Sequence, residues 1–262
     1  MTAPGFRPIV APMKGPGILR GLYLPAVNLL YPANCHVCGT ALGPFGDSPL
    51  CPACLRAIRP IGARACSLCG LPLPETVPVP EGFLCGECRT TRRYFRRALS
   101  AFVYDGPARE LVHMFKYSGR SYLARFFAVA IAEAVEGRVD ITGTELVVPV
   151  PLHRSRRRKR GYNQADEIGR RLARLLGLRA ERRALERVRR TASQVGKTRE
   201  GRRANVRGSF RVVDRRLVRK RSIFLVDDVF TTGATVDECS KVLLRAGASR
   251  VVVLTAARDI LG

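Results

Sequence analysis

Eight of the nine cysteines in this 262-residue chain stand in four C-x2-C pairs within about the first third of the sequence. Two residues between two cysteines let one tight turn present both sulfurs to a single metal ion, and two such turns complete the tetrahedral shell that zinc prefers. The spacing therefore predicts two structural Zn²⁺ sites. Pairing in sequence order gives the ligand sets Cys35, Cys38, Cys51 and Cys54, and Cys66, Cys69, Cys85 and Cys88.

Two alternatives to this assignment stay open at the level of sequence: ligand sets that interleave, and disulfide bonds. Disulfides would require a secreted protein, and the start of the chain lacks the compact apolar segment of a signal peptide. Four thiolates fill the zinc shell, so neither site would keep an open position for catalysis. Gly39 and Gly70 each follow the second cysteine of a pair, where we expect a positive φ. His36 is expected to be a spectator, and Cys239 a small packed residue.

The segment from Ile223 to Thr235 (IFLVDDVFTTGAT) is the second stretch whose residue types indicate chemistry. An apolar strand leads into the paired acids Asp227 and Asp228, and a loop of small residues then opens a helix. Backbone N–H groups and threonine hydroxyls at a helix start suit a phosphate, and the acids suit neighbouring ribose hydroxyls. The chain has neither a Walker loop nor a Rossmann fingerprint. The alternative is a plain strand-turn-helix with a solvated acid pair.

The formal net charge of +25, from 46 basic and 21 acidic residues, is concentrated in one segment. Between Arg154 and Arg221, 23 Arg and 3 Lys stand against six acids, a net charge of +20. Such a concentration attracts polyanions and predicts a nucleic acid or a phosphorylated substrate; a solvated surface is the alternative. Tyr162, Tyr117 and Tyr94 lie near basic residues and could stack on bases, or lie at the edge of the core.

Strands and helices alternate after the cysteine-rich part, which favours an α/β domain with a parallel sheet. The length suits one larger and one small domain, and no apolar run is long enough to span a bilayer. We expect a flexible leader over 1–19, a ribbon domain over 20–92 and the α/β domain over 93–262. The expected strands cover 98–104, 144–151, 222–226 and 250–255; the expected helices cover 107–118, 121–136, 163–176 and 234–246; the basic run between 154 and 160 is expected to be a loop.

Taken together, these segments resemble the ComF family of phosphoribosyltransferase-like proteins over about residues 20–258. Two four-cysteine ribbons are followed by AFVYDGPARELVHMFKYSGR, VVPVPLHRSRRRKRGYNQADEIG, ERVRRTASQVGKTREGRRANVRGSF and IFLVDDVFTTGAT. The last segment resembles the phosphoribosyl-pyrophosphate (PRPP) motif of type I phosphoribosyltransferases. The resemblance implies that fold, a parallel sheet flanked by helices, behind a small N-terminal double zinc-ribbon domain.

Carried onto this sequence, the resemblance implies a PRPP site in which Mg²⁺ bridges PRPP oxygens and Asp227 and Asp228 bind the ribose hydroxyls. The implied 5-phosphate loop comprises Val229, Phe230, Thr231, Thr232, Gly233, Ala234 and Thr235. The implied pyrophosphate loop comprises Pro151, Leu152, His153 and Arg154. A mobile hood over about 191–208 would contribute Gln194, Arg199 and Asn205. The following basic residues exceed the needs of one pyrophosphate and are expected to contact nucleic acid: Arg156, Arg157, Arg158, Lys159 and Arg160.

Two functions follow from this resemblance. The first is a protein of DNA uptake in natural competence, which binds PRPP and single-stranded DNA in the cytoplasm. It would work with a ComFA-like helicase and meet the inner face of the membrane through partners, without stable insertion. The second is an active phosphoribosyltransferase of nucleotide salvage, which displaces pyrophosphate from the anomeric carbon through a cation-like transition state. No residue in the sequence identifies the acceptor or establishes that catalysis occurs.

Overall fold

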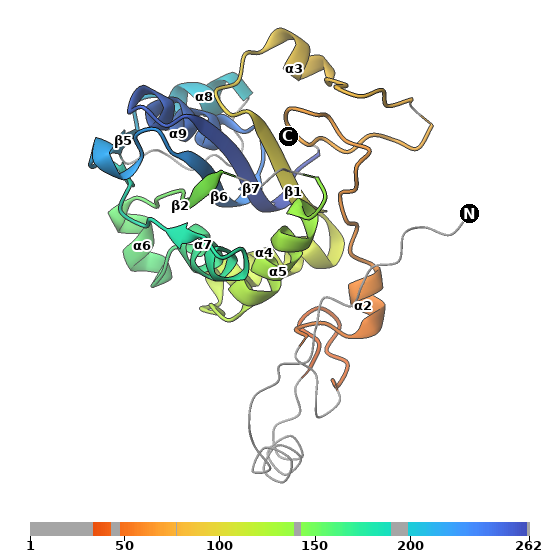
Figure 1. The fold of residues 1–262 in the computed structure, drawn as a ribbon. Helices are drawn as coiled ribbons and strands as arrows, with labels where there is room; N and C mark the ends of the chain where they lie inside the picture. The colour runs from red at the N-terminus through yellow and green to blue at the C-terminus, as the bar shows by residue number, and fades with distance from the viewer. Residues whose placement is uncertain (1–33, 43–47, 77, 139–142, 190–198, 261–262) are drawn as a thin grey trace.

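The computed structural model describes residues 34–42, 48–76, 78–138, 143–189 and 199–260 (Figure 1). Most of these residues form a parallel sheet with helices on both faces, and two small cysteine-rich lobes precede the sheet. This architecture confirms the predicted α/β class with a double zinc ribbon in front of it. Within the described ranges, no helix is long and apolar enough to cross a bilayer.

Five strands of the main sheet pair in the order β1-β7-β6-β2-β3, and all of these pairings are parallel. In β6, Phe224 and Val226 pack towards one layer of helices, whereas Ile223 and Leu225 pack towards the other. Because both faces are covered, the strand must be apolar at every position, which explains its continuous hydrophobic run. The strands are β1 (Arg97–Val103), β2 (Thr144–Pro149), β3 (Arg179–Ala180), β6 (Ser222–Phe230) and β7 (Arg250–Arg258).

Helices α4, α5 and α7 cover one face of the sheet, and α9 covers the other (Figure 1). The Asn163 side chain accepts a hydrogen bond from the Ala165 N–H at 3.2 Å and caps α7, as predicted. Cys239 in α9 is fully buried, which confirms its expected packing role. The bounds lie within about two residues of those expected: α4 (Gly106–Tyr117), α5 (Leu123–Val135), α7 (Gln164–Leu175) and α9 (Ala234–Arg245).

The expectation of a loop over the basic run is wrong, because Arg154–Arg160 forms helix α6. Arginine and lysine are good helix formers, so charge density alone does not prevent a short helix here. The imidazole of His153 accepts a hydrogen bond from the Ser155 N–H at the start, and Gly161 ends the helix at φ +79°. Ordering the run as a helix directs its side chains to different faces.

Strand β6 also extends beyond its predicted end and includes the acid pair. Its neighbour β7 continues to Arg258, and the register pairs Asp227 with Thr255 and Phe230 with Arg258. Ladder hydrogen bonds to a long neighbouring strand therefore keep the two acids extended, although aspartate has a low intrinsic strand preference. The turn after the strand is only Thr231 to Gly233.

The segment between α7 and β6 contains an antiparallel pair, β4 (Leu185–Arg187) with β5 (Phe210–Val212), and a 3-10 turn, η1 (Arg215–Leu217). Residues expected to belong to a hood loop form helix α8 (Arg199–Val206) instead. Gln194 lies outside the described residues. Regular secondary structure thus forms in a segment whose polar composition had suggested a loop.

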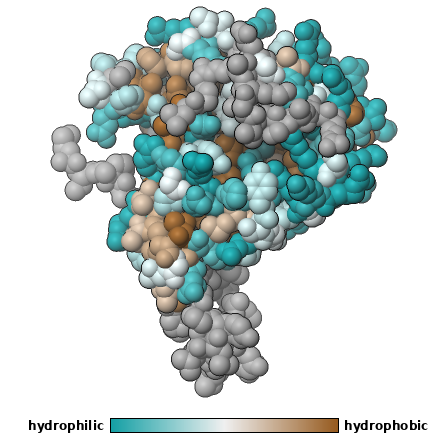
Figure 2. Space-filling view, turned by 180° about the vertical axis from the view of Figure 1, so that it is seen from behind, coloured by the Kyte–Doolittle hydropathy of each residue, from teal (hydrophilic) through white to brown (hydrophobic). Residues whose placement is uncertain are grey.

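The two cysteine-rich lobes contain the short helices α2 (Pro52–Arg56) and α3 (Gly86–Thr90), and they cover the edge strand β1. The Ala98 N–H donates to the Leu68 carbonyl at 2.7 Å, and the Ile61 N–H donates to the Ala101 carbonyl at 2.9 Å. These bonds use backbone groups that an exposed edge would leave open to other chains. The described surface is largely hydrophilic when seen from behind (Figure 2).

Candidate functional site

The eight paired cysteines form two separate clusters, each with its four sulfurs within 4.8 Å of one another. Four sulfurs held about 2.3 Å from one zinc would lie about 3.8 Å apart. The Cys38 and Cys51 sulfurs are 3.6 Å apart, and those of Cys69 and Cys85 are 3.7 Å apart. Both clusters therefore fit tetrahedral zinc, and pairing in sequence order is confirmed over interleaving.

The first turn of each cluster has the same backbone geometry. The Gly39 N–H donates to the Cys35 carbonyl at 2.9 Å, and the Gly70 N–H donates to the Cys66 carbonyl at 2.8 Å. Both glycines have positive φ, +75° and +68°, as predicted. A Cβ on Gly70 would also lie 2.6 Å from the Ala98 carbonyl oxygen, because this turn packs against β1. His36 stands outside the sulfur cluster, where its ring hydrogen-bonds to the Tyr122 hydroxyl.

The second cluster is tied directly to the sheet by Arg258 at the end of β7. Its buried guanidinium donates to the Cys69 carbonyl at 2.6 Å and to the Cys69 Sγ at 3.3 Å. The same guanidinium lies 4.4 Å from the centroid of the Phe230 ring. That ring packs under Gly233, where a Cβ would lie 2.4 Å from Phe230 Cζ. A chain of direct contacts therefore connects the zinc ligands to the turn after β6.

A cavity of about 300 Å³ lies at the carboxyl ends of β2 and β6, and we call it the acid-pair cavity. Parallel sheets commonly bind ligands at this edge. The implied site residues that line it are Pro151, Leu152, Asp227, Asp228, Val229, Phe230, Thr231, Gly233 and Thr235. Thr232 and Ala234 are buried and do not line it, and His153 and Arg154 line a neighbouring cavity instead.

The turn after β6 places backbone N–H groups at this cavity. Gly233 has φ +74° and forms the N-terminal boundary of α9, and the Thr232 hydroxyl accepts a hydrogen bond from the Ala234 N–H at 3.4 Å. The first turn of a helix leaves N–H groups without intrahelical partners, and these groups favour an anion. Both the φ of Gly233 and the ring of Phe230 exclude a larger residue at this position.

Lys116, from the last turn of α4, is a residue of the cavity that sequence reasoning missed. Its Nζ lies 3.2 Å from Asp228 Oδ1, and both side chains are largely buried. Burial alone would lower the pKa of Lys116, but the charges of Asp228 and its neighbours outweigh burial and raise this pKa. In the sequence, Lys116 is a single cation in an amphipathic helix, and such a residue is equally typical of a solvent-exposed position.

Asp227 differs electrostatically from Asp228, although the two are adjacent in sequence. Burial, and then the charge of Asp228, raise the pKa of Asp227 from 3.8 to about 7. Asp228 is the member of the pair that contacts Lys116. One Asp227 oxygen accepts the Asp228 N–H at 2.9 Å. The cavity thus combines an acid that is paired with a lysine and an acid whose pKa is raised to about 7 by burial.

Helix α6 directs its arginines towards two cavities. Arg156 and Arg160, one helical turn apart, line the acid-pair cavity, whereas Arg157 lines the neighbouring one. Arg158 and Lys159 are exposed and line neither. Further residues of the acid-pair cavity that sequence reasoning did not identify are Tyr104, Gln164, Arg187 and Asp259. They come from four separate segments, which only the fold brings together.

The three candidate stacking tyrosines occupy different environments. Tyr162 donates to the Phe115 carbonyl and packs at the edge of the core, which identifies it as structural. Tyr117 is 62% exposed and lies under the guanidinium of Arg160, 5.1 Å from its ring centroid. Tyr94 is 39% exposed and has the Lys241 ammonium 5.5 Å from its ring centroid. Base stacking by Tyr117 and Tyr94 stays a prediction.

The implied hood residues are only partly placed. Arg199 and Asn205 belong to α8, and Gln194 lies outside the described residues. Helix α8 packs near α9, so this segment lies beside the helix that follows the Thr231–Gly233 turn. Arg199 and Asn205 therefore lie on a helix beside α9, and their contact with a ligand stays a prediction.

Comparison with known proteins extends over nearly the whole chain. A family profile described as "Double zinc ribbon domain" matches residues 26–89. The DNA utilization protein YhgH of Escherichia coli O6:H1 is 34% identical over 236 residues, covering 88% of this chain and 100% of that protein. Competence protein F of Haemophilus influenzae is 30% identical over 214 residues, covering 80% of this chain and 90% of that protein.

Among solved structures, the glutamine PRPP amidotransferase from B. subtilis aligns with 53% of this chain and 26% of its own, at 22% identity and a TM-score of 0.34. The similarity to YhgH and to competence protein F is more extensive, since it covers 88% and 80% of this chain. With two four-cysteine clusters in front of a parallel sheet, the chain belongs to the ComF family.

Proposed function

We propose that the protein binds PRPP with Mg²⁺ in the acid-pair cavity and acts on single-stranded DNA during DNA uptake. The observation that carries the PRPP part is the juxtaposition, at one cavity, of two acids with the turn that opens α9. Asp227 and Asp228 would bind the ribose hydroxyls, and the turn beginning at Thr231 would bind the 5-phosphate. The pyrophosphate would lie against Pro151 and Leu152.

The charge of the cavity suits this ligand. Its lining includes four cations, Lys116, Arg156, Arg160 and Arg187, and guanidinium groups bind phosphate oxygens well. Magnesium prefers oxygen ligands and usually takes only one or two protein carboxylates together with substrate phosphates. Among the described residues, only the cysteine clusters offer three or more metal-ligating side chains together. The cavity therefore suits Mg²⁺ that arrives on PRPP, held chiefly by oxygens of the ligand.

Lys116 would hold the Asp228 side chain in position to accept a hydrogen bond from a ribose hydroxyl. Asp227 would change its protonation when a ligand and its cation enter, since their charges alter the field that now raises its pKa. No protein nucleophile is required, because departure of pyrophosphate needs only charge stabilisation and exclusion of water. These residues would thus support both PRPP binding and, if an acceptor enters, transfer of the phosphoribosyl group.

The DNA part of the proposal is supported by charge and by the relatives. The segment from 154 to 221 has a net charge of +20, and relatives are named for DNA utilization and competence. Salvage transferase activity is the alternative. Base-dependent release of pyrophosphate by the protein, with no affinity for single-stranded DNA, would favour that alternative.

Calorimetric titration with PRPP and Mg²⁺ tests the site. We expect saturable binding by the wild type, and a loss of at least about tenfold in affinity for the double variant Asp227→Asn, Asp228→Asn. Asp214→Asn is a matched control, because Asp214 caps the distant η1 turn and its cap can be kept by asparagine. Equal affinities for wild type and double variant would refute the assignment of the cavity.

A salt titration tests the DNA part separately. For single strands, the logarithm of the binding constant falls by about 0.7 per phosphate contact for each tenfold rise in salt. We expect a steep fall for a short oligo-dT strand, because several arginines would engage its backbone. A flat response would refute DNA binding by the basic segment and would leave the PRPP proposal intact.

A further inference from the structure

A second cavity, of about 630 Å³, adjoins the acid-pair cavity. The two cavities share Pro151, Leu152, Asn163 and Arg187, so ligands in them would be neighbours. The second cavity is bounded by the start of α6 on one side and by the segment that leads into β4 on the other. We call it the arginine cavity because of its lining.

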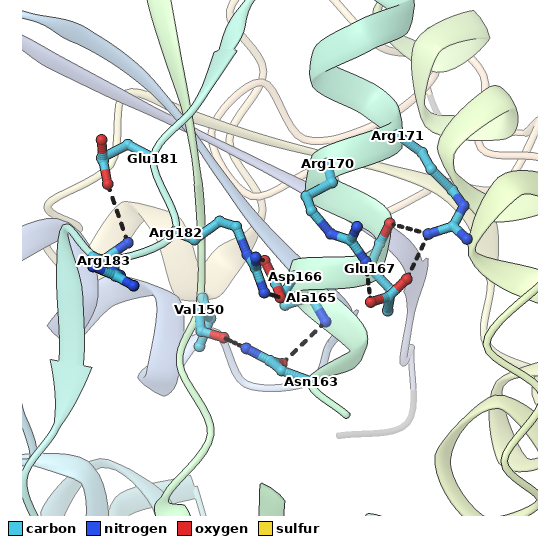
Figure 3. Close-up of polar contacts among 10 residues, drawn as sticks. All are labelled: Val150, Asn163, Ala165, Asp166, Glu167, Arg170, Arg171, Glu181, Arg182 and Arg183. Carbon is cyan, nitrogen blue, oxygen red and sulfur yellow. Dashed lines mark hydrogen bonds and ion pairs between the residues drawn. The ribbon is translucent and has the colours of Figure 1, made fainter. Parts of the chain in front are cut away.

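Five arginines and two acids line the arginine cavity, which gives the lining a formal charge of +3. Both acids are already engaged by arginine side chains. Arg182 donates to the two oxygens of Asp166, each at 2.5 Å (Figure 3). The guanidinium of Arg211 donates to Glu186 at 2.5 Å. The positive charge of the remaining arginines is therefore not cancelled by the acids of the cavity.

Arg157 and Arg183 both line this cavity, Arg157 from α6 and Arg183 from the segment before β4, and both are exposed. Neither side chain has an ion-pair partner among the described residues. Glu181, near Arg183 in sequence, uses one oxygen for the Arg183 backbone N–H at 3.2 Å (Figure 3). Its other oxygen pairs with Arg179 at 3.2 Å. The two guanidinium groups are thus available to an anion that enters.

The frame around these arginines is held by partly buried hydrogen bonds. The Asn163 amide donates to the Val150 carbonyl at 3.0 Å, while its oxygen accepts from the Ala165 N–H at 3.2 Å (Figure 3). Asp166, one residue further along α7, is buried and holds Arg182 in place. Leu152, Leu185 and Val188 add apolar surface to the same lining.

From this geometry we propose that the arginine cavity binds a nucleotide, with its phosphate on Arg157 and Arg183 and its sugar and base against the apolar wall. The volume lies within the range of small-molecule sites, and guanidinium groups match phosphate oxygens in pairs. The phosphate could belong to a free mononucleotide or to one nucleotide of a DNA strand. This proposal rests on the proposed function, because it places a nucleotide in the cavity next to the one proposed for PRPP.

The test compares two double variants that remove equal charge. Arg157→Gln with Arg183→Gln removes the pair that lines the cavity, and Arg109→Gln with Arg125→Gln is the control, at exposed positions of α4 and α5 that line neither cavity. The probes are thymidine 5-monophosphate, thymidine and a short oligo-dT strand, titrated into the zinc-loaded protein at constant salt. Circular dichroism checks that both variants keep the wild-type fold, which we expect because the substituted side chains are exposed.

We expect the cavity variant to lose about tenfold or more in affinity for a phosphate-bearing probe, and the control about twofold or less. If the monophosphate binds and competes with the strand, a single nucleotide occupies the cavity; if only the strand binds, the DNA backbone supplies the phosphate. Equal losses in both variants, no loss in the cavity variant, or equal affinity for thymidine and its monophosphate would each overturn the proposal. PRPP titration of the wild type is independent, so failure of either proposal is recognisable.

Discussion

Replacing Asp227 with asparagine should stabilise the protein while weakening its proposed PRPP site. Burial and the charge of Asp228 raise the pKa of Asp227 from 3.8 to about 7. Between these two pH values the unfolded chain releases the proton while the folded protein keeps it. The folded protein then binds more protons than the unfolded chain, so this group makes stability fall as pH rises from about 4 to 7.

The size of the effect follows from the shift. One pKa unit corresponds to about 1.4 kcal/mol, so the full shift at Asp227 is worth about 4 kcal/mol above pH 7. The side chain keeps some exposure to solvent, which screens part of this cost. We therefore expect Asp227→Asn to raise the free energy of unfolding by roughly 2–4 kcal/mol at pH 8 and by about half as much at pH 5.5. Asparagine keeps the oxygen that accepts the Asp228 N–H.

Urea unfolding followed by circular dichroism, at equal zinc loading, measures this difference at both pH values. Asp214→Asn is the control with the opposite sign, because the hydrogen bonds from Arg216 lower the pKa of Asp214 and its ionised form stabilises the fold. A difference between Asp227→Asn and wild type that does not change with pH, or a variant less stable than wild type at pH 8, would refute the reasoning. Weaker PRPP binding by the same variant would show that the acid is retained for function at a cost in stability.

Three further outcomes are expected. Lys116→Met leaves a largely buried carboxylate without its cation, so we expect a loss of roughly 2–4 kcal/mol at pH 8 and a smaller loss at pH 5.5, measured by urea unfolding. Gly39→Ala should lower the free energy of unfolding by about 1 kcal/mol, because the glycine has a positive φ. Gly70→Ala should lower it several times more, because the added Cβ would lie 2.6 Å from the Ala98 carbonyl oxygen of β1. Equal losses of stability would contradict the packing of the second ribbon on the sheet. Cys69→Ser should weaken PRPP binding more than Cys38→Ser does, because the second cluster contacts Arg258, which packs on the Phe230 ring beneath Gly233. Zinc content is measured for both variants, and equal losses of PRPP affinity would contradict this connection.

The sequence by itself determined the parts that depend on local chemistry. Cysteine spacing predicted both zinc clusters, since ligands two residues apart share one turn whatever surrounds them. Alternating apolar strands and helices predicted the parallel sheet, and Asn163 predicted the start of α7. The predicted positive φ of Gly39 and Gly70 was confirmed because the turn itself requires it.

Tertiary structure decided the parts that depend on distant neighbours. Lys116 reaches Asp228 from a helix more than one hundred residues earlier, and no local pattern distinguishes it from a surface lysine. The basic run formed a helix rather than a loop, and that helix assigned its arginines to two different cavities. The pKa of Asp227 likewise depends on burial and on charges contributed by other elements. Residue types therefore indicated which chemistry the chain could perform, and packing decided which side chains meet to perform it, because contacts between distant segments exist only after the chain has folded.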